Sequence, residues 1–144
     1  MKSNRRYFYK KQLIFLIILL ISMAVCGCSR GNTRKVELVV GESEIFEEKE
    51  IKAAMDQVLV HFKRHFSGCD LLELSYLEEI SNRSSDACAQ QYGADQAIIL
   101  LSSFYVDSSA GGGSLNPNSI YEKFQWILTR DEGGAWVLQT WGYG

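Results

Sequence analysis

The chain has few of the residues from which reactive centres are built. Its 144 residues include one proline, two histidines and four cysteines. His61 is followed by Phe62 where a metalloprotease helix has glutamate, and Gly111–Gly113 lacks the Lys-Ser/Thr of a phosphate loop. Neither Cys69 nor Cys88 belongs to a Cys-x-x-Cys pair. We find no nucleophile–base pair, and we therefore expect no catalysis, no cofactor and no metal site.

A long hydrophobic run is also missing. Leu13–Val25 is apolar or near-neutral, but a membrane-spanning helix needs about 20 such residues. A basic head without acidic residues precedes this run, and small and polar residues follow it at once. This order is typical of a cleaved export signal. The basic head consists of Lys2, Arg5, Arg6, Lys10 and Lys11.

The cysteine at the expected cleavage point makes the signal resemble that of a bacterial lipoprotein. Lipoprotein signals have a small residue directly before the modified cysteine. Gly27 precedes Cys28, whereas the bulky Val25 precedes Cys26. We therefore expect lipid attachment at Cys28 and a location at the extracytoplasmic face of the cell membrane, since two acyl chains give a stable anchor. The alternative is an ordinary secretory signal.

Removal of the signal leaves an acidic protein. Positions 1–28 contain five of the fifteen basic residues and no acidic residue. The rest of the chain therefore has ten basic and seventeen acidic residues, a formal charge of −7. Such a protein is repelled by nucleic-acid phosphates. We expect no nucleic-acid partner, and the balance also disfavours membrane binding through a basic patch.

The remaining chain fits one domain. We expect a signal and lipobox at 1–28, a short polar tether at 29–34 and a single domain at 35–144. Cys69 and Cys88 predict either a disulfide, permitted outside the cytoplasm, or two buried free thiols. We take the bridge as the prediction.

Apolar residues at spacings of three and four predict a helix over 47–66, with acidic residues in its first turn and basic residues in its last. Ser67 and Gly68 then end it. A short helix is expected over 86–92, closed by Gly93. Strands are expected over 71–79, 97–107, 121–130 and 135–141, and 35–40 predicts a strand or an extended lead-in.

The order of these elements favours an α+β fold. We expect one long N-terminal helix packed on a curved antiparallel sheet of about four strands, with a short second helix.

Four segments together resemble a family of uncharacterised lipoproteins of clostridial-type Firmicutes: FSGCDLLELSY (66–76), QYGADQAIILLSSFYVD (91–107), GGGSLNPNS (111–119) and WILTRDEGGAWVLQTWGYG (126–144). The domain also resembles the cone of the nuclear-transport-factor-two and cystatin-like superfamily. That resemblance implies a helix inside a bent sheet and a pocket at the mouth of the cone. It implies no activity, because this cone supports many functions.

Candidate binding residues follow from the loop 107–119 and from the aromatic residues. A long loop in a small domain is either a plain connection or a binding loop. Aromatic residues fill the core or line a pocket. The ligand-binding candidates are Tyr76, Tyr105, Asp107, Asn116, Asn118, Trp126, Trp141 and Tyr143.

The two histidines, His61 and His65, are spaced so that both rings can reach one metal ion. No third ligand is evident, and we interpret them as helix-flanking residues. Our hypothesis is a lipid-anchored binding or interaction module for a small molecule, a peptide or an envelope component. The alternative is a structural or accessory envelope protein without a pocket.

Overall fold

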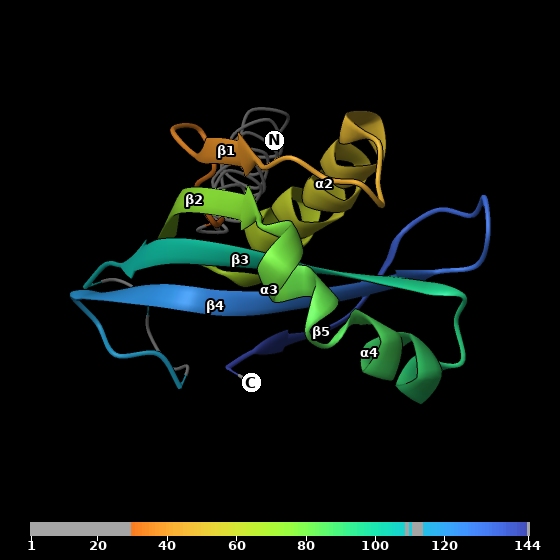
Figure 1. Cartoon of the computed structure of the whole chain (residues 1–144). Coiled ribbons are helices and arrows are strands. Elements are labelled where there is room, and N and C mark those ends of the chain that lie inside the picture. Colours follow the sequence, from red (N-terminus) through yellow and green to blue (C-terminus); the bar gives the residue numbers. More distant parts are fainter. Residues whose placement is uncertain (1–29, 109, 111–113, 144) are drawn as a thin grey trace, which may run out of the picture.

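Five strands form one sheet, and helices lie on both of its faces (Figure 1). The structure is a computed structural model that describes residues 30–108, 110 and 114–143. The strands are β1 (Glu37–Val40), β2 (Cys69–Tyr76), β3 (Gln96–Val106), β4 (Ser119–Arg130) and β5 (Val137–Gly142). The helices of the described residues are α2 (Glu48–His65), α3 (Glu78–Asn82) and α4 (Ser85–Tyr92).

The predicted fold class is wrong in three respects. The sheet has five strands in the order β1-β2-β3-β4-β5, whereas about four were expected. It is mixed, because β1 pairs with β2 in parallel while the other pairs are antiparallel. The described residues form three short helices, of which α2 has 18 residues. We expected one long helix packed on a smaller sheet, but the structure is mostly sheet, with three short helices in its described residues.

Helix α2 forms where the apolar spacing predicts it. Its buried residues are Ile51, Ala54, Met55, Val58 and Phe62. A capping box joins Glu47 and Glu50 at its start, so that two backbone N–H groups of the first turn are satisfied. After the helix, Gly68 has a φ of 72°, a left-handed conformation that glycine adopts without strain. The chain thereby turns directly into β2.

The main core fills the space between α2 and the sheet. Its largest side chains, which include Trp126, Tyr76, Phe62 and Phe104, have no exposed surface. Edge-to-face ring contacts join several of them, such as Phe62 and Phe104 at 5.7 Å between centroids. Aromatic side chains thus fill the space between α2 and the sheet.

The opposite face of the sheet, called the outer face below, is only partly covered. Cys88 and Ala89 of α4 pack with Ala97 and Ile99 at the beginning of β3 in a small second core. Both α3 and α4 lie on this side, away from α2 (Figure 1). Among the described residues, no helix covers the remaining outer face of β2, β3 and β4, and the candidate site lies there.

The residues that precede β1 are held against the domain. Gly31 is buried, and its N–H donates to the carbonyl of Lys63 at 3.2 Å. The N–H of Asn32 donates to the carbonyl of Cys69 at 2.8 Å, and the Asn32 carbonyl accepts from the N–H of Leu71 at 2.8 Å. The described part of the expected tether is therefore bonded to the end of α2 and the beginning of β2.

Candidate functional site

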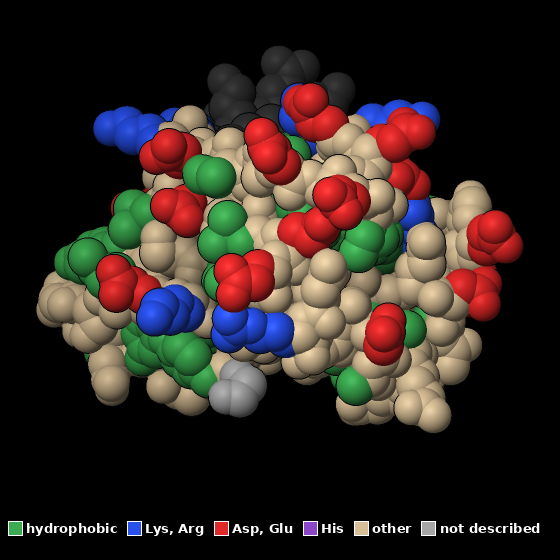
Figure 2. Space-filling view, in the orientation of Figure 1, with side chains coloured by type: hydrophobic (Ala, Val, Ile, Leu, Met, Phe, Trp, Pro, Cys, Tyr) green, Lys and Arg blue, Asp and Glu red, His purple; other side chains and the backbone are tan. Residues whose placement is uncertain are grey.

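A groove of about 560 Å³ lies on the outer face of the sheet, beside α3. Figure 2 views this side of the molecule, where acidic and basic side chains lie intermixed. Groove volumes of this size suit small ligands. The lining comes from β2, β3, β4 and the α3 region, and includes Glu73, Ser75, Leu77, Ile80, Arg83, Leu101, Ser103, Glu122, Lys123 and Gln125.

Two irregularities of the sheet meet beside Ser103. The register between β2 and β3 shifts between Leu71 and Glu73, and the register between β3 and β4 shifts between Ser102 and Phe104. Lys123 lies in the second irregularity and has a φ of 55°. A left-handed conformation is uncommon for lysine. Bulges of this kind redirect side chains and are frequent next to functional sites.

The charged residues of the groove are of both signs. Glu73 and Glu122 supply carboxylates, while Arg83 and Lys123 supply cations. Arg83 forms an exposed ion pair with Glu79 at 2.6 Å. Lys123 has no ion pair among the residues that the structure describes. The groove therefore offers a lysine ammonium whose charge is available to a ligand.

Uncharged groups complete the lining. Ser75, Ser103 and Gln125 carry hydrogen-bonding side chains, and Leu77 and Ile80 contribute apolar surface near α3. The hydroxyl of Ser75 lies 3.5 Å from the Leu101 carbonyl, to which it donates. No histidine or cysteine lines the groove. The arrangement suits recognition through charge and hydrogen bonds.

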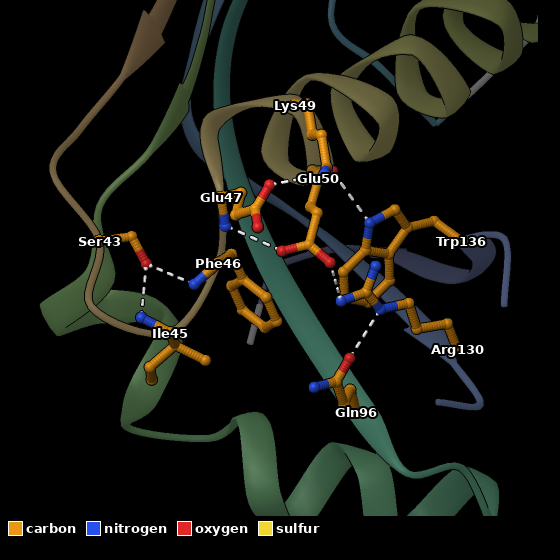
Figure 3. Close-up of polar contacts among 9 residues, drawn as sticks. All are labelled: Ser43, Ile45, Phe46, Glu47, Lys49, Glu50, Gln96, Arg130 and Trp136. Atoms are coloured by element: carbon orange, nitrogen blue, oxygen red, sulfur yellow. Dashed lines mark hydrogen bonds and ion pairs between the residues drawn. The ribbon is translucent and has the colours of Figure 1, made fainter. Parts of the chain in front are cut away.

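A second groove, of about 490 Å³, lies between the end of β1 and the beginning of α2. Its polar lining is largely acidic, with Glu42, Glu47 and Glu48. The hydroxyl of Ser43 accepts from the N–H groups of Ile45 and Phe46 at 3.1 and 3.0 Å (Figure 3). Ser43 thereby organises the loop before α2, which gives this residue a structural role.

Ser43 also belongs to a small network with Tyr76 and Glu78. Its hydroxyl donates to the Glu78 carboxylate and lies 3.3 Å from the Tyr76 hydroxyl. This bond lowers the pKa of Glu78, while burial raises the pKa of Tyr76. Tyr76 is fully buried, so this candidate residue joins the loop before α2 to the sheet and is closed to a ligand.

A partly buried ion pair lies beneath the beginning of α2 (Figure 3). Arg130 Nη2 lies 2.6 Å from Glu50 Oε1, and Arg130 Nε donates to Gln96 Oε1 at 2.7 Å. The guanidinium carbon is 4.2 Å from the ring centroid of Trp136, within the range of a cation–π contact. Hydrogen bonds from Glu47 and Arg130 lower the pKa of Glu50. With all these groups paired, the cluster is structural.

The histidine pair lies beside the C-terminal strand. The rings of His61 and His65 stack at 4.3 Å, and the His61 ring is 4.1 Å from that of Trp141. His61 Nε2 is buried and has no hydrogen-bond partner among the described residues. Burial, and secondarily His65, lowers the pKa of His61. Within residues 30–108, 110 and 114–143, no group of three or more His, Cys, Asp or Glu side chains could hold a metal.

The other predicted ligand residues do not converge on one site. Trp126 is fully buried, with its Nε1 donating to Ser102 Oγ at 2.8 Å. The Tyr105 hydroxyl donates to Asn118 Oδ1 at 3.2 Å at one end of the sheet. Trp141 and Tyr143 are exposed at the end of β5.

Loop residues 107–118 use their polar groups locally where the structure describes them. The Asp107 carboxylate accepts from the N–H of Ala110 at 3.1 Å. The N–H of Asn116 donates to the Tyr121 hydroxyl at 2.8 Å. These contacts stabilise the loop against β4 and do not gather its side chains around a cavity.

Cys69 and Cys88 are free thiols. Cys69 belongs to the main core beside Val106, and Cys88 to the second core beside Ala97 and Ile99. Seven or more residues of β3 separate these places, which is more than roughly 20 Å along the strand. A disulfide needs Cα atoms within about 7 Å, so the structure does not bring the pair together. Cys28 lies outside the described residues.

The groove residues were not among the candidates found from the sequence. A signal did exist, because polar residues alternate with core residues along three strands. In β2, Glu73 and Ser75 flank the buried Leu74. In β3 and β4, Ser103 and Gln125 each lie between two buried residues. The bulge at Lys123 leaves no comparable pattern in the sequence.

No helix of the described residues is both long and apolar enough to cross a membrane. Comparison with family models, with curated proteins and with solved structures yields no match to this chain.

Proposed function

We propose that the protein is a lipid-anchored, extracytoplasmic binding module whose outer-face groove takes a small zwitterionic ligand, such as an amino acid or a short peptide with free ends. The observation that carries the proposal is the groove beside α3, where two carboxylates, two cations and several neutral polar groups line about 560 Å³. We propose binding without catalysis.

The mixed charge of the groove selects the ligand class. A ligand of one sign would be attracted to one pair of charged residues and repelled by the other. A zwitterion can place its ammonium near Glu73 or Glu122 and its carboxylate near Lys123 or Arg83. The apolar surface of Leu77 and Ile80 then suits an aliphatic side chain.

The anchor is the second part of the proposal. The basic head, the short apolar run and the Gly27-Cys28 junction support cleavage and lipidation at Cys28. Mass spectrometry of the mature N-terminus tests this part directly. A diacylated Cys28 is expected, and an intact Met1 or an unmodified Cys28 would contradict it.

Titration of the purified, isotope-labelled protein with alanyl-leucine tests the groove. We expect saturable amide shifts at Ser103, Glu122 and Lys123. N-acetyl-alanyl-leucine and alanyl-leucine amide each lack one charge and are expected to bind about tenfold more weakly, a difference of about 1.4 kcal/mol. Lys123→Gln should weaken the dipeptide similarly. Lys49→Gln, at the N-terminal end of α2, is the control.

Two results would overturn the groove proposal. One is the absence of saturable shifts at millimolar dipeptide. The other is equal binding of the dipeptide and its two charge-capped forms, because the charged groups would then play no part in recognition.

An accessory envelope protein is the second candidate, and β5 is the observation that favours it. This strand is one edge of the sheet, and it exposes Val137 and Trp141. Exposed edges with aromatic residues are frequent partner surfaces. A photo-crosslinking residue at Val137 that captures one discrete protein in cells would favour this role over the groove.

A further inference from the structure

The chain enters the domain at one defined end. Gly31 and Asn32 are hydrogen-bonded to Lys63 at the last turn of α2 and to Cys69 at the beginning of β2. Gly31 follows Cys28 by three positions, with two residues between them, and three residue steps span at most about 11 Å. A lipid on Cys28 therefore brings the bilayer surface next to the C-terminal end of α2.

This end of the domain is basic, although the protein without its signal is acidic. Arg30, Arg34, Lys35, Lys63 and Arg64 are all exposed here. None of them has an ion pair among the described residues. Acidic groups are present at this end as well: Asp70 accepts from Asn32 Nδ2 at 2.8 Å, and the N–H of Asp107 donates to the Gly68 carbonyl at 2.9 Å.

The opposite end of the domain is acidic. Glu47 and Glu48 lie at the beginning of α2, where Lys49 and Lys52 pair with them. Acidic residues still outnumber basic ones here, because Glu42, Glu44 and Glu50 lie at or just before this turn, and Asp131 and Glu132 lie in the turn after β4. Acidic side chains are visible at the end of the molecule where β4 turns into β5 (Figure 2). The basic and the acidic end lie about 27 Å apart along α2. This separation of charge gives the domain an electric dipole with its positive end beside the anchor.

Aromatic residues accompany the cations. Trp141 is 43% exposed and Tyr143 is 62% exposed. The Trp141 ring contacts His61, one turn before the end of α2, and the Tyr143 ring stacks on Tyr121 at 6.3 Å. Tryptophan and tyrosine together with lysine and arginine are the residues enriched at the membrane interface.

We propose that this end, made of Arg30, Lys63, Arg64, Trp141 and Tyr143, is a membrane-facing surface that rests on anionic lipid headgroups. The inference depends on the proposed lipid anchor. The net negative charge of the protein without its signal disfavours membrane binding as a whole. At the C-terminal end of α2, however, the exposed side chains are mostly basic, so this end is attracted to anionic lipid. Attachment at Cys28 keeps the surface at a high effective concentration near the bilayer, so weak contacts suffice to orient the domain.

The three tryptophans allow a direct test. Trp126 and Trp136 are 0% and 4% exposed, which leaves Trp141 as the exposed one. The mature protein, lipidated at Cys28, is reconstituted into phosphatidylglycerol–phosphatidylcholine vesicles that contain phosphatidylcholine brominated close to the headgroup. We expect these lipids to quench Trp141 and to protect it from aqueous iodide. The W141F variant should lose this response.

A matched control uses the other end of β5. Val137 is 55% exposed and pairs with Thr129 near the acidic turn. V137W in the W141F background should be quenched by iodide and not by the brominated lipid. Equal lipid quenching of the two proteins would overturn the proposal, because the domain would then have no preferred orientation.

Charge reversal tests the electrostatic part. Each Lys or Arg near an anionic surface favours the docked state by roughly fivefold, so K63E/R64E should lower the ratio of docked to undocked protein, measured by lipid quenching of Trp141, by well over fivefold. K49E/K52E, at the acidic end of α2, should leave it unchanged. About 1 M salt should act like K63E/R64E, since it shortens the Debye length to about 3 Å.

Vesicle flotation separates the two proposals. Protein that fails to float with the vesicles contradicts the lipid anchor. Protein that floats but shows no lipid quenching of Trp141 contradicts the membrane-facing surface and leaves the anchor intact.

Discussion

Arg130 and Glu50, eighty residues apart in the chain, form an ion pair of 2.6 Å that joins β4 to the first turn of α2. Their side chains are 9% and 26% exposed. Trp136 covers the guanidinium and donates its indole N–H to the Glu50 carbonyl at 2.9 Å. The pair thus connects the helix, the central part of the sheet and the last hairpin.

Breaking this ion pair should destabilise the protein. Arg130→Ala leaves the Glu50 carboxylate partly buried without its partner, and we expect a loss of about 3 kcal/mol in the free energy of unfolding, measured by urea denaturation. Arg83→Ala is the matched control, because its ion pair with Glu79 has the same length but is exposed. That variant should lose less than about 1 kcal/mol. Equal losses would show that burial is irrelevant here.

The hydrogen bond between Trp126 and Ser102 gives a second prediction. Both residues are buried, and Ser102→Ala removes the only acceptor that the described residues offer to the Trp126 indole. The expected loss of unfolding free energy is about 1–3 kcal/mol. Ser103→Ala, one residue later and partly exposed on the groove side, should change stability by less than about 0.5 kcal/mol. A neutral Ser102→Ala would contradict the role given to this bond.

The two thiols of the domain should be unreactive. Burial, and then the carboxylates of Asp107 and Asp70, raises the pKa of Cys69 to about 11. Burial also raises the pKa of Cys88. Because the thiolate is the nucleophile, iodoacetamide at neutral pH should label neither residue in the native protein and both after unfolding. Peptide mass spectrometry measures the labelling, and a Cys69–Cys88 disulfide peptide would refute the separation seen in the structure.

His61 should make stability depend on pH. Burial lowers its pKa in the folded state from the usual 6.5, so the unfolded chain binds the proton more readily. The contribution of neutral His61 is complete above the unfolded pKa and is lost as the pH falls through 6.5 towards the folded value. Urea midpoints measured from about pH 7.5 to 5.5 should therefore fall, and His61→Gln should flatten the decline. An equal slope in both proteins would contradict this assignment.

The local elements followed from the sequence, but their arrangement did not. Helix α2 was expected over 47–66 and is observed at Glu48–His65, since its apolar spacing and charged ends are local signals. The strand over 71–79 was placed too late, because Glu78–Asn82 is helical. The parallel pairing of β1 with β2 depends on contacts across the whole of α2, and no local pattern reports such contacts.

The candidate site illustrates the same limit. Aromatic residues were expected to fill the core or to line a pocket. Trp126 and Trp141 are paired across β4 and β5, but Trp126 is buried in the core whereas Trp141, on the edge strand, is exposed. The groove needs residues from three strands and the region of α3. The bulge at Lys123 depends on a left-handed backbone conformation that lysine rarely adopts. The residue types around Lys123 do not predict this conformation.

The parallel pairing of β1 and β2 also has a kinetic consequence. Glu37 pairs with Glu73, and Asn32 bridges to Asp70, so the first strand of the described chain must wait until α2 and β2 have been formed. Hairpins such as β4–β5 can close early because their partners are neighbours in the chain. Long-range pairing slows folding, and β1 should therefore be the last strand to become protected from hydrogen exchange during refolding.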